Sequence, residues 1–327
     1  MVKDNTGNGE KMNIADGTAY AATQDVVGDN TNNGGDKSMV KDNTNNGGLV
    51  VTSEENIFRE TEKKTILSVE NLTVCFPGKR NIFGKAISVV PIVKNVSFEV
   101  KENETVGLVG ESGCGKTTLG RAILQLIKPS SGKIVLEGTD LTTLNSGQLR
   151  VIRKDLQIVF QDPYGSLNPR ITIGDAIMEP LNVHRIHSSK KQRKEQVVEL
   201  LEKVSLQGDH FNRYPHQFSG GQRQRICIAR ALALQPDFLI FDESVSALDV
   251  SVQAQVLNLI NDLKAEMNFS SIFISHDLSV VHYISDRVLV MNKGRIVEEG
   301  TADDIYFNPS NAYTQQLVQA IPGKGLF

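Results

Sequence analysis

The sequence contains no tryptophan, only three cysteines, and no apolar run long enough to cross a membrane. The thiols of Cys75, Cys114 and Cys227 form no CxxC pair, which excludes a zinc or iron–sulfur framework and suits a reducing compartment. A membrane-spanning helix needs about 20 apolar residues, and the first residues contain no apolar signal core. We therefore expect a cytosolic protein that a partner holds at any membrane on which it acts.

A strong excess of charge is also missing. The net charge is -3, and residues 1–60 hold ten acidic and five basic side chains, so the remainder carries +2. Non-specific binding to nucleic acid requires a larger positive patch. The one basic run, 190–194, predicts the exposed start of a helix. We expect no nucleic-acid partner.

Residues 1–60 lack apolar periodicity and repeat a polar unit, seen as VKDNTGNG, VGDNTNNGG and VKDNTNNGG. Such a segment buries too little apolar surface to offset the entropy of ordering it. We predict a disordered low-complexity tail over 1–60 and an ordered domain from residue 61.

Beyond the tail, short apolar runs alternate with helical patterns, which predicts an α/β domain with a parallel sheet. Two alternating strands at the start predict an antiparallel β subdomain, and the mostly helical stretch at about 162–234 predicts an inserted helical subdomain. A helix is expected from Lys116 to about Ile127. The strands are expected at 65–76, 91–100, 104–110, 133–138, 156–161, 237–243, 270–276 and 286–291.

The segment GESGCGKTT at 110–118 matches the phosphate-loop pattern and lies between an apolar strand and a helix. Its glycines let the backbone N–H groups point inward, and the helix N-terminus adds its dipole. Lys116 is expected to reach the β- and γ-phosphates of ATP, and the Thr117 hydroxyl to bind Mg²⁺. The predicted nucleotide-binding residues here are Gly110, Glu111, Ser112, Gly113, Cys114, Gly115, Lys116, Thr117 and Thr118.

The segment FLIFDE ends an apolar strand on two carboxylates. Ligands of such sheets bind beyond the carboxyl ends of the strands. Asp242 is therefore predicted to hold Mg²⁺, and Glu243 to polarise the attacking water.

The segment FSGGQRQR at 218–225 resembles the signature motif of ABC ATPases, usually LSGGQ, with Phe218 replacing the leucine. The resemblance covers about 64–322 and implies a P-loop NTPase (RecA-like) core, an ABC ATPase domain over 61–310 and a short C-terminal segment over 311–327. Gln161 matches the Q-loop glutamine, and His276 in FISHD the switch histidine. By this resemblance the catalytic residues are Glu243, His276 and Gln161, the metal ligands are Thr117, Gln161 and Asp242, and further nucleotide contacts come from Phe76, Ser219, Gly220, Gly221, Gln222 and Asp249.

The resemblance also implies partners. Two ATPase chains would pack head to tail, each completing the other's site with its SGGQ segment. The segments 156–181 and 311–322 look like those of oligopeptide and dipeptide importers, whose motors work as a heterodimer of two related ATPases under two membrane permeases, with an extracytoplasmic solute-binding protein. The chain would then act peripherally, at the cytoplasmic face of the membrane.

Two alternatives stay open at this point: a nickel or metallophore importer, and a non-transport ABC ATPase. The segment 162–170 contains two prolines and one glycine, which predicts a surface loop. By the resemblance it would receive a permease helix, with Tyr164 and Leu167 lining the groove.

Overall fold

The computed structural model describes residues 63–78 and 89–321, all within one compact unit, Glu60–Phe327. The predicted tail over 1–60 and the end of the predicted C-terminal segment lie outside the described residues. No helix within the described ranges is long and apolar enough to cross a bilayer.

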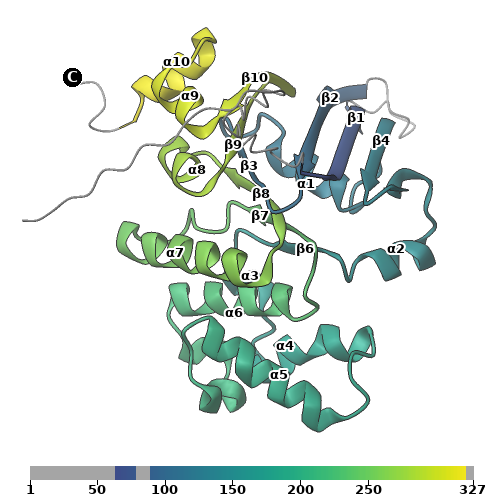
Figure 1. Ribbon diagram of the computed structural model, residues 1–327, viewed down its shortest axis with the longest axis vertical. Helices are drawn as coiled ribbons and strands as arrows, with labels where there is room; N and C mark the ends of the chain where they lie inside the picture. The colour runs from purple at the N-terminus through teal and green to yellow at the C-terminus, as the bar shows by residue number, and fades with distance from the viewer. Residues whose placement is uncertain (1–62, 79–88, 322–327) are drawn as a thin grey trace, which may run out of the picture. The chain divides into compact units, whose positions relative to one another are not determined.

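The first strands form the expected antiparallel subdomain. β1 (Thr65–Pro77) pairs with both β2 (Val89–Lys101) and β4 (Ser131–Leu136), and β4 pairs with the short β5 (Thr139–Asp140). The order β2-β1-β4-β5 joins segments on either side of the phosphate loop (Figure 1).

The second sheet has the order β10-β9-β3-β8-β7-β6. Five of its strands are parallel, which confirms the predicted core, and the edge strand β10 runs antiparallel to β9. Sequence reasoning did not predict β10. The bounds are β3 (Thr105–Val109), β6 (Leu156–Val159), β7 (Phe238–Asp242), β8 (Ser270–Ser275), β9 (Arg287–Asn292) and β10 (Arg295–Thr301).

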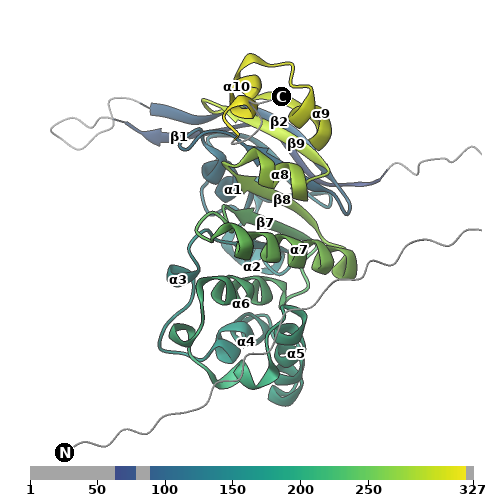
Figure 2. The same cartoon turned by 90° about the vertical axis from the view of Figure 1, so that its left-hand side faces the viewer.

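Side chains of the parallel strands alternate between two apolar layers. In β7, Phe238 and Ile240 belong to a layer shared with α1 (Lys116–Ile123) and the antiparallel sheet, whereas Leu239 and Phe241 belong to a layer shared with most of the other helices. Helix α1 is therefore enclosed between the two sheets (Figure 2).

Helix α1 ends four residues before the predicted Ile127. Gln125 adopts a left-handed backbone conformation with φ of 53°, and the Leu126 N–H bonds the carbonyl of Arg121 at 2.9 Å. This 6→1 bond satisfies a terminal carbonyl and ends the helix.

The predicted helical stretch holds α3 (Pro163–Ser166), α4 (Ile173–Val183), α5 (Lys190–Lys203) and α6 (Gly220–Leu232). Helices α4, α5 and α6 lie together at one end of the unit in both views, and α3 packs next to α6 (Figures 1 and 2). At the other end lie α9 (Ala302–Phe307) and α10 (Ala312–Gln319). The remaining helices are α2 (Ser146–Ile152), α7 (Val250–Met267), α8 (Leu278–Ile284) and the 3-10 turns Leu141–Thr143, Gly208–Asn212 and Pro215–Gln217.

The segment after Gln161 departs from the predicted loop. Pro163–Ser166 forms one helical turn, because proline suits the first helical position and the Asp162 carboxylate caps it by accepting the Tyr164 N–H at 2.8 Å. Leu167 is only 3% exposed and packs in the core, so its prediction as a groove-lining residue is wrong. Tyr164 is 63% exposed, as that prediction requires.

Candidate functional site

The phosphate loop connects the end of β3 to the first turn of α1. Gly110 has φ of 156°, and a Cβ at this position would lie 2.1 Å from the carbonyl oxygen of Met291. Gly115, with φ of 115°, directly precedes α1. Only glycine fits both positions without displacing neighbouring backbone. The first-turn N–H groups of a helix have no acceptor within the helix, so α1 presents free donors to the loop.

The Lys116 ammonium lies inside this loop. It is 3% exposed, and it donates to the carbonyl oxygens of Gly110 at 2.7 Å and Glu111 at 3.0 Å. A carboxylate oxygen of Glu243 is 3.8 Å away. A buried ammonium with one nearby carboxylate is a ready partner for an anion such as phosphate.

Asp242 ends β7 beside the start of α1. Its carboxylate accepts a hydrogen bond from the Thr117 hydroxyl at 2.8 Å. Burial raises the pKa of the Asp242 carboxyl, and the hydrogen bond from Thr117 opposes that rise. A cation beside this carboxylate would relieve the unfavourable burial of its charge.

Glu243 follows with a left-handed backbone conformation, φ 50°, which is uncommon for a residue other than glycine. Its N–H donates to the carbonyl of Ile274 at 3.0 Å, and its carbonyl accepts from the Ser246 N–H and hydroxyl at 3.1 and 2.9 Å. These bonds hold the backbone conformation and turn the side chain towards the loop. Strained backbone conformations of this kind are common at functional residues.

The Glu243 carboxylate has three polar neighbours. The Gln161 amide, beyond the end of β6, donates to it at 3.1 Å, and Nδ1 of His276, beyond β8, lies 3.6 Å from it. Lys116 is the third neighbour. The carboxyl ends of three neighbouring parallel strands, β6, β7 and β8, thus supply one cluster, which brings together the predicted residues Gln161, Glu243 and His276.

Three of these groups, Lys116, Gln161 and Glu243, line a cavity of about 240 Å³. Its wall contains six loop residues together with Gln161 and Glu243. Ile92, from β2, completes it and was not foreseen; a Cβ on Gly115 would lie 3.0 Å from the Ile92 carbonyl oxygen. The full lining is Ile92, Ser112, Gly113, Gly115, Lys116, Thr117, Thr118, Gln161 and Glu243.

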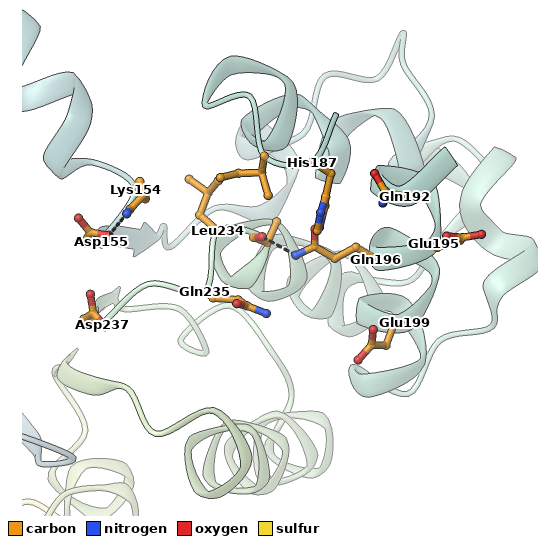
Figure 3. A pocket seen from close by; sticks show the side chains of 12 residues that line it. Lys154, Asp155, His187, Gln192, Glu195, Gln196, Glu199, Leu234, Gln235 and Asp237 are labelled. Carbon is orange, nitrogen blue, oxygen red and sulfur yellow. Dashed lines mark hydrogen bonds and ion pairs between the residues drawn. The ribbon is translucent and has the colours of Figure 1, made fainter. Parts of the chain in front are cut away.

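A larger cavity, of about 710 Å³, lies elsewhere (Figure 3). It is bounded by α5 and by residues that precede β6 and β7, at the strand ends opposite Asp242. Its charged groups are mostly acidic, and its one lysine, Lys154, is paired with Asp155 at 3.2 Å. Negative lining would repel a triphosphate, so the smaller cavity at the phosphate loop is the candidate site.

A model of the ABC transporter family matches residues 93–246. A putative peptide import ATP-binding protein of Brucella ovis is 53% identical over 231 residues, which cover 71% of this chain and 73% of that protein. The chain belongs to the ABC transporter family. The glutathione import ATP-binding protein of Salmonella typhimurium is 49% identical over 271 residues, 82% of this chain but 43% of that longer protein.

Solved structures agree. The ATP-binding cassette MJ0796, in a dimeric post-hydrolysis state bound to ADP and phosphate, is 28% identical with a TM-score of 0.64, covering 72% of this chain and 98% of that chain. The cassette CbiO1 of Clostridium perfringens, part of an ABC transporter complex, is 25% identical with a TM-score of 0.64, covering 74% and 90%. The ABC family and the ATP-binding cassette fold predicted from sequence are confirmed, and the chain is an ABC ATPase.

The predicted signature residues lie apart from this cavity in the ABC ATPase. Ser219, the N-cap of α6, accepts the Gln222 N–H at 3.3 Å, and the Gln222 side chain accepts the Ser219 N–H at 3.0 Å. This capping box fixes the helix start. Among the described residues that line the loop cavity there is none from 219–222, nor Asp249, which caps α7.

Phe76 likewise does not line the loop cavity as the structure describes it. It lies near the end of β1, pairs with Val90 of β2 and is 38% exposed. Its role in stacking on adenine stays a prediction. The neighbouring strand β2 instead brings Ile92 to the loop, two residues beyond Val90.

Proposed function

We propose that this ABC ATPase is the ATP-binding and ATP-hydrolysing subunit of an importer that takes up peptides across the cytoplasmic membrane. The observation that carries the chemical part is the convergence of Lys116, Gln161 and Glu243 on one cavity at the phosphate loop, with His276 beside the Glu243 carboxylate. The cargo follows from the relatives, which are named for the import of peptide and of glutathione, itself a peptide.

The residues at the loop fit a magnesium nucleotide. Lys116 and the free N–H groups of α1 would hold the β- and γ-phosphates. Thr117 and Asp242, already hydrogen-bonded at 2.8 Å, offer the hard oxygen ligands that magnesium prefers, and Gln161 adds an amide oxygen. Bound magnesium would neutralise charge on the phosphate oxygens. One or two side chains suffice, since the ion keeps water and phosphate ligands.

Glu243 is the proposed general base. Its carboxylate is held between the Gln161 amide and His276, so its oxygens are fixed where a water attacking the γ-phosphate would lie. His276 is 54% exposed by side chain and can move as the site closes. Gln161 belongs to the segment that leads into the helical insertion, so it would sense whether the site is occupied.

A second ATPase chain is part of the proposal. Ser219, Gly220, Gly221 and Gln222 begin α6 away from the chain's own loop cavity, and a helix start offers N–H donors to an anion. These residues, with Asp249, would complete the site of a related partner chain. The dimeric state of the solved cassette MJ0796 supports this arrangement.

Two permeases are the proposed membrane partners. A cavity of about 460 Å³ lies where the core meets the helical insertion, lined by Arg121, Asp242 and Arg230 with residues from 160–166. It adjoins the turn that carries the exposed Tyr164. A short permease helix seated there would contact the Gln161 segment directly, which would keep the chain peripheral at the cytoplasmic face; an extracytoplasmic binding protein would deliver the cargo.

The test is uptake in the source cell after deletion of the gene. Labelled dipeptides and longer peptides are offered in parallel with nickel ions, and the deletion is complemented with the wild-type chain or with Lys116→Ala. Loss of peptide uptake that only the wild-type chain restores is the expected result. Loss of nickel uptake alone would favour a metal importer, and unchanged uptake of both would overturn the importer role.

A further inference from the structure

The C-terminal helix α10 contacts the phosphate loop. The Glu111 N–H donates a hydrogen bond to the phenol oxygen of Tyr313 at 3.0 Å, across 202 residues of sequence. Burial raises the pKa of the Tyr313 phenol, so the side chain is neutral at physiological pH. Its hydroxyl oxygen accepts the hydrogen bond from the Glu111 N–H in this protonated form. Sequence reasoning had assigned this tyrosine to a segment outside the ATPase domain.

This hydrogen bond holds one end of a peptide group whose other end already has a partner. The Gly110–Glu111 peptide contributes the Gly110 carbonyl, which accepts from Lys116 Nζ at 2.7 Å, and the Glu111 N–H, which donates to Tyr313. In a trans peptide these two groups point in opposite directions. Lys116 and Tyr313 therefore fix the orientation of the peptide plane from both sides.

The orientation of this plane matters because glycine permits it to rotate. Gly110 has φ of 156°, a value that side-chain-bearing residues rarely adopt. Without Tyr313, rotation of the plane would move the Gly110 carbonyl away from the Lys116 ammonium. It would also change the direction of the Glu111 N–H at the entrance to the loop.

Tyr313 is itself held firmly. The Ser310 N–H and hydroxyl both donate to one carboxylate oxygen of Glu298 in β10, each at 2.6 Å. The Asn311 side chain caps α10 by accepting the Tyr313 N–H at 2.9 Å and donates to the Val297 carbonyl at 3.3 Å. The start of α10 is thus tied to the edge of the core sheet.

The C-terminal end of α10 lies near the segment 276–279, which begins with His276. Leu317 of α10, with Ala320 and Ile321 just beyond its end, lines a cavity of about 240 Å³ together with Val109, at the end of β3, and residues 276–279. One element therefore touches both the phosphate loop and the segment that carries His276. Among the helices that the structure describes, only α10 accepts a hydrogen bond from the Glu111 N–H.

We propose that Tyr313 is a positioning residue for ATP binding, which sets the orientation of the Gly110–Glu111 peptide and thereby links the C-terminal helix to the affinity of the phosphate loop. The inference rests on the proposed role of that loop as the nucleotide site. Tyr313 acts on the loop backbone, so it is expected to change the affinity for ATP more than the rate of hydrolysis at saturation.

The test compares Tyr313→Phe with the wild-type full-length chain. The variant removes one oxygen and keeps the ring packing. Loss of one neutral hydrogen bond predicts a rise of about 2- to 10-fold in the Kd for MgATP, measured by titration of a fluorescent ATP analogue. The KM for ATP should rise equally, with kcat changed by less than about twofold. Hydrogen exchange at the Glu111 amide should become faster.

Tyr283→Phe is the matched control, because its phenol donates to Asn258 on the surface of α7. It loses a comparable bond and should leave the Kd unchanged. An unchanged Kd in Tyr313→Phe, or an equal rise in both variants, would overturn the inference. Lys116→Ala distinguishes failure of the proposed nucleotide site from failure of the proposed role of Tyr313. If Lys116→Ala still binds ATP normally, the proposed nucleotide site is wrong. If Lys116→Ala loses ATP binding while Tyr313→Phe binds normally, only the role of Tyr313 is refuted.

Discussion

Replacement of Glu243 with glutamine tests most directly the proposal that Glu243 is the general base while Lys116 binds the phosphates. The amide keeps the shape of the side chain and can still meet Gln161 and His276, but it cannot accept a proton from water. General-base catalysis contributes about 10²- to 10⁴-fold in rate. We therefore expect the kcat for ATP hydrolysis in the assembled transporter to fall by about that factor.

The affinity of Glu243→Gln for ATP should not fall with the rate of hydrolysis. The Glu243 carboxylate lies 3.8 Å from the Lys116 ammonium, and at an effective dielectric constant of 20 two such charges attract by on the order of 4 kcal/mol. In the nucleotide-free chain this attraction competes with phosphate for the lysine. Its removal frees Lys116, so Glu243→Gln should bind ATP at least as tightly as the wild-type chain and should stay longer in the closed dimer.

The assays are phosphate release, ATP-analogue titration and size-exclusion chromatography with and without ATP. Glu266→Gln is the matched control, since this carboxylate pairs with Lys203 at 2.6 Å on the surface; an exposed pair of this kind contributes little. The reasoning fails if Glu243→Gln hydrolyses ATP at the wild-type rate, or if it loses ATP binding.

Three further changes have expected outcomes. Lys116→Ala should raise the Kd for ATP at least about tenfold, since a hydrogen bond to a charged group is lost, and normal affinity in a titration would contradict this. Tyr164→Asp should reduce co-purification of the permeases while ATP binding stays normal; Tyr214→Asp, at another exposed tyrosine of the helical insertion, should reduce neither. Burial raises the pKa of Cys227 to about 11, so at pH 8 only about 10⁻³ of this thiol is ionised, and iodoacetamide should modify the half-buried Cys75 first. Because the pKa of Cys227 is higher in the folded chain than in the unfolded chain, the neutral thiol stabilises the fold relative to its thiolate up to about pH 9, and this contribution is lost as the pH rises towards 11. Faster modification of Cys227 than of Cys75 in the folded chain would contradict the burial of Cys227.

The parts of the site that sequence predicts are those in which local chemistry is decisive. The loop at 110–118 requires glycine where the backbone turns or touches Met291, and it requires a lysine to meet phosphate. Asp242 ends a fully buried strand and Glu243 follows it, so their position at the carboxyl edge of the sheet follows from the apolar run alone. Gln161 and His276 follow β6 and β8 in the same way, which is why these residues come together.

The predictions from sequence fail where tertiary packing overrides the local pattern of the residues. β10 has mostly half-buried residues because it is the edge strand, so its apolar alternation is weak. Helix α1 ends at a glutamine in a left-handed conformation, which sequence does not mark as it would a glycine. Leu167 follows a turn of polar and proline residues, yet it enters the core because the helical insertion packs over it.

The contact between Tyr313 and Glu111 has a different origin and could not be predicted from any motif. The donor is a backbone N–H, which every residue except proline carries, so the loop sequence gives no sign of it. The acceptor lies in a helix that follows the antiparallel edge strand β10, and that strand was itself missed. A tyrosine in an eight-residue helix is ordinarily explained by packing. Here its phenol oxygen instead reaches the N–H that shares a peptide group with the Gly110 carbonyl, one of the two carbonyls bound to Lys116. In the loop proposed to bind phosphate, the Gly110–Glu111 peptide is therefore contacted from both sides, by a lysine that the motif requires and by a tyrosine that only the fold brings to it.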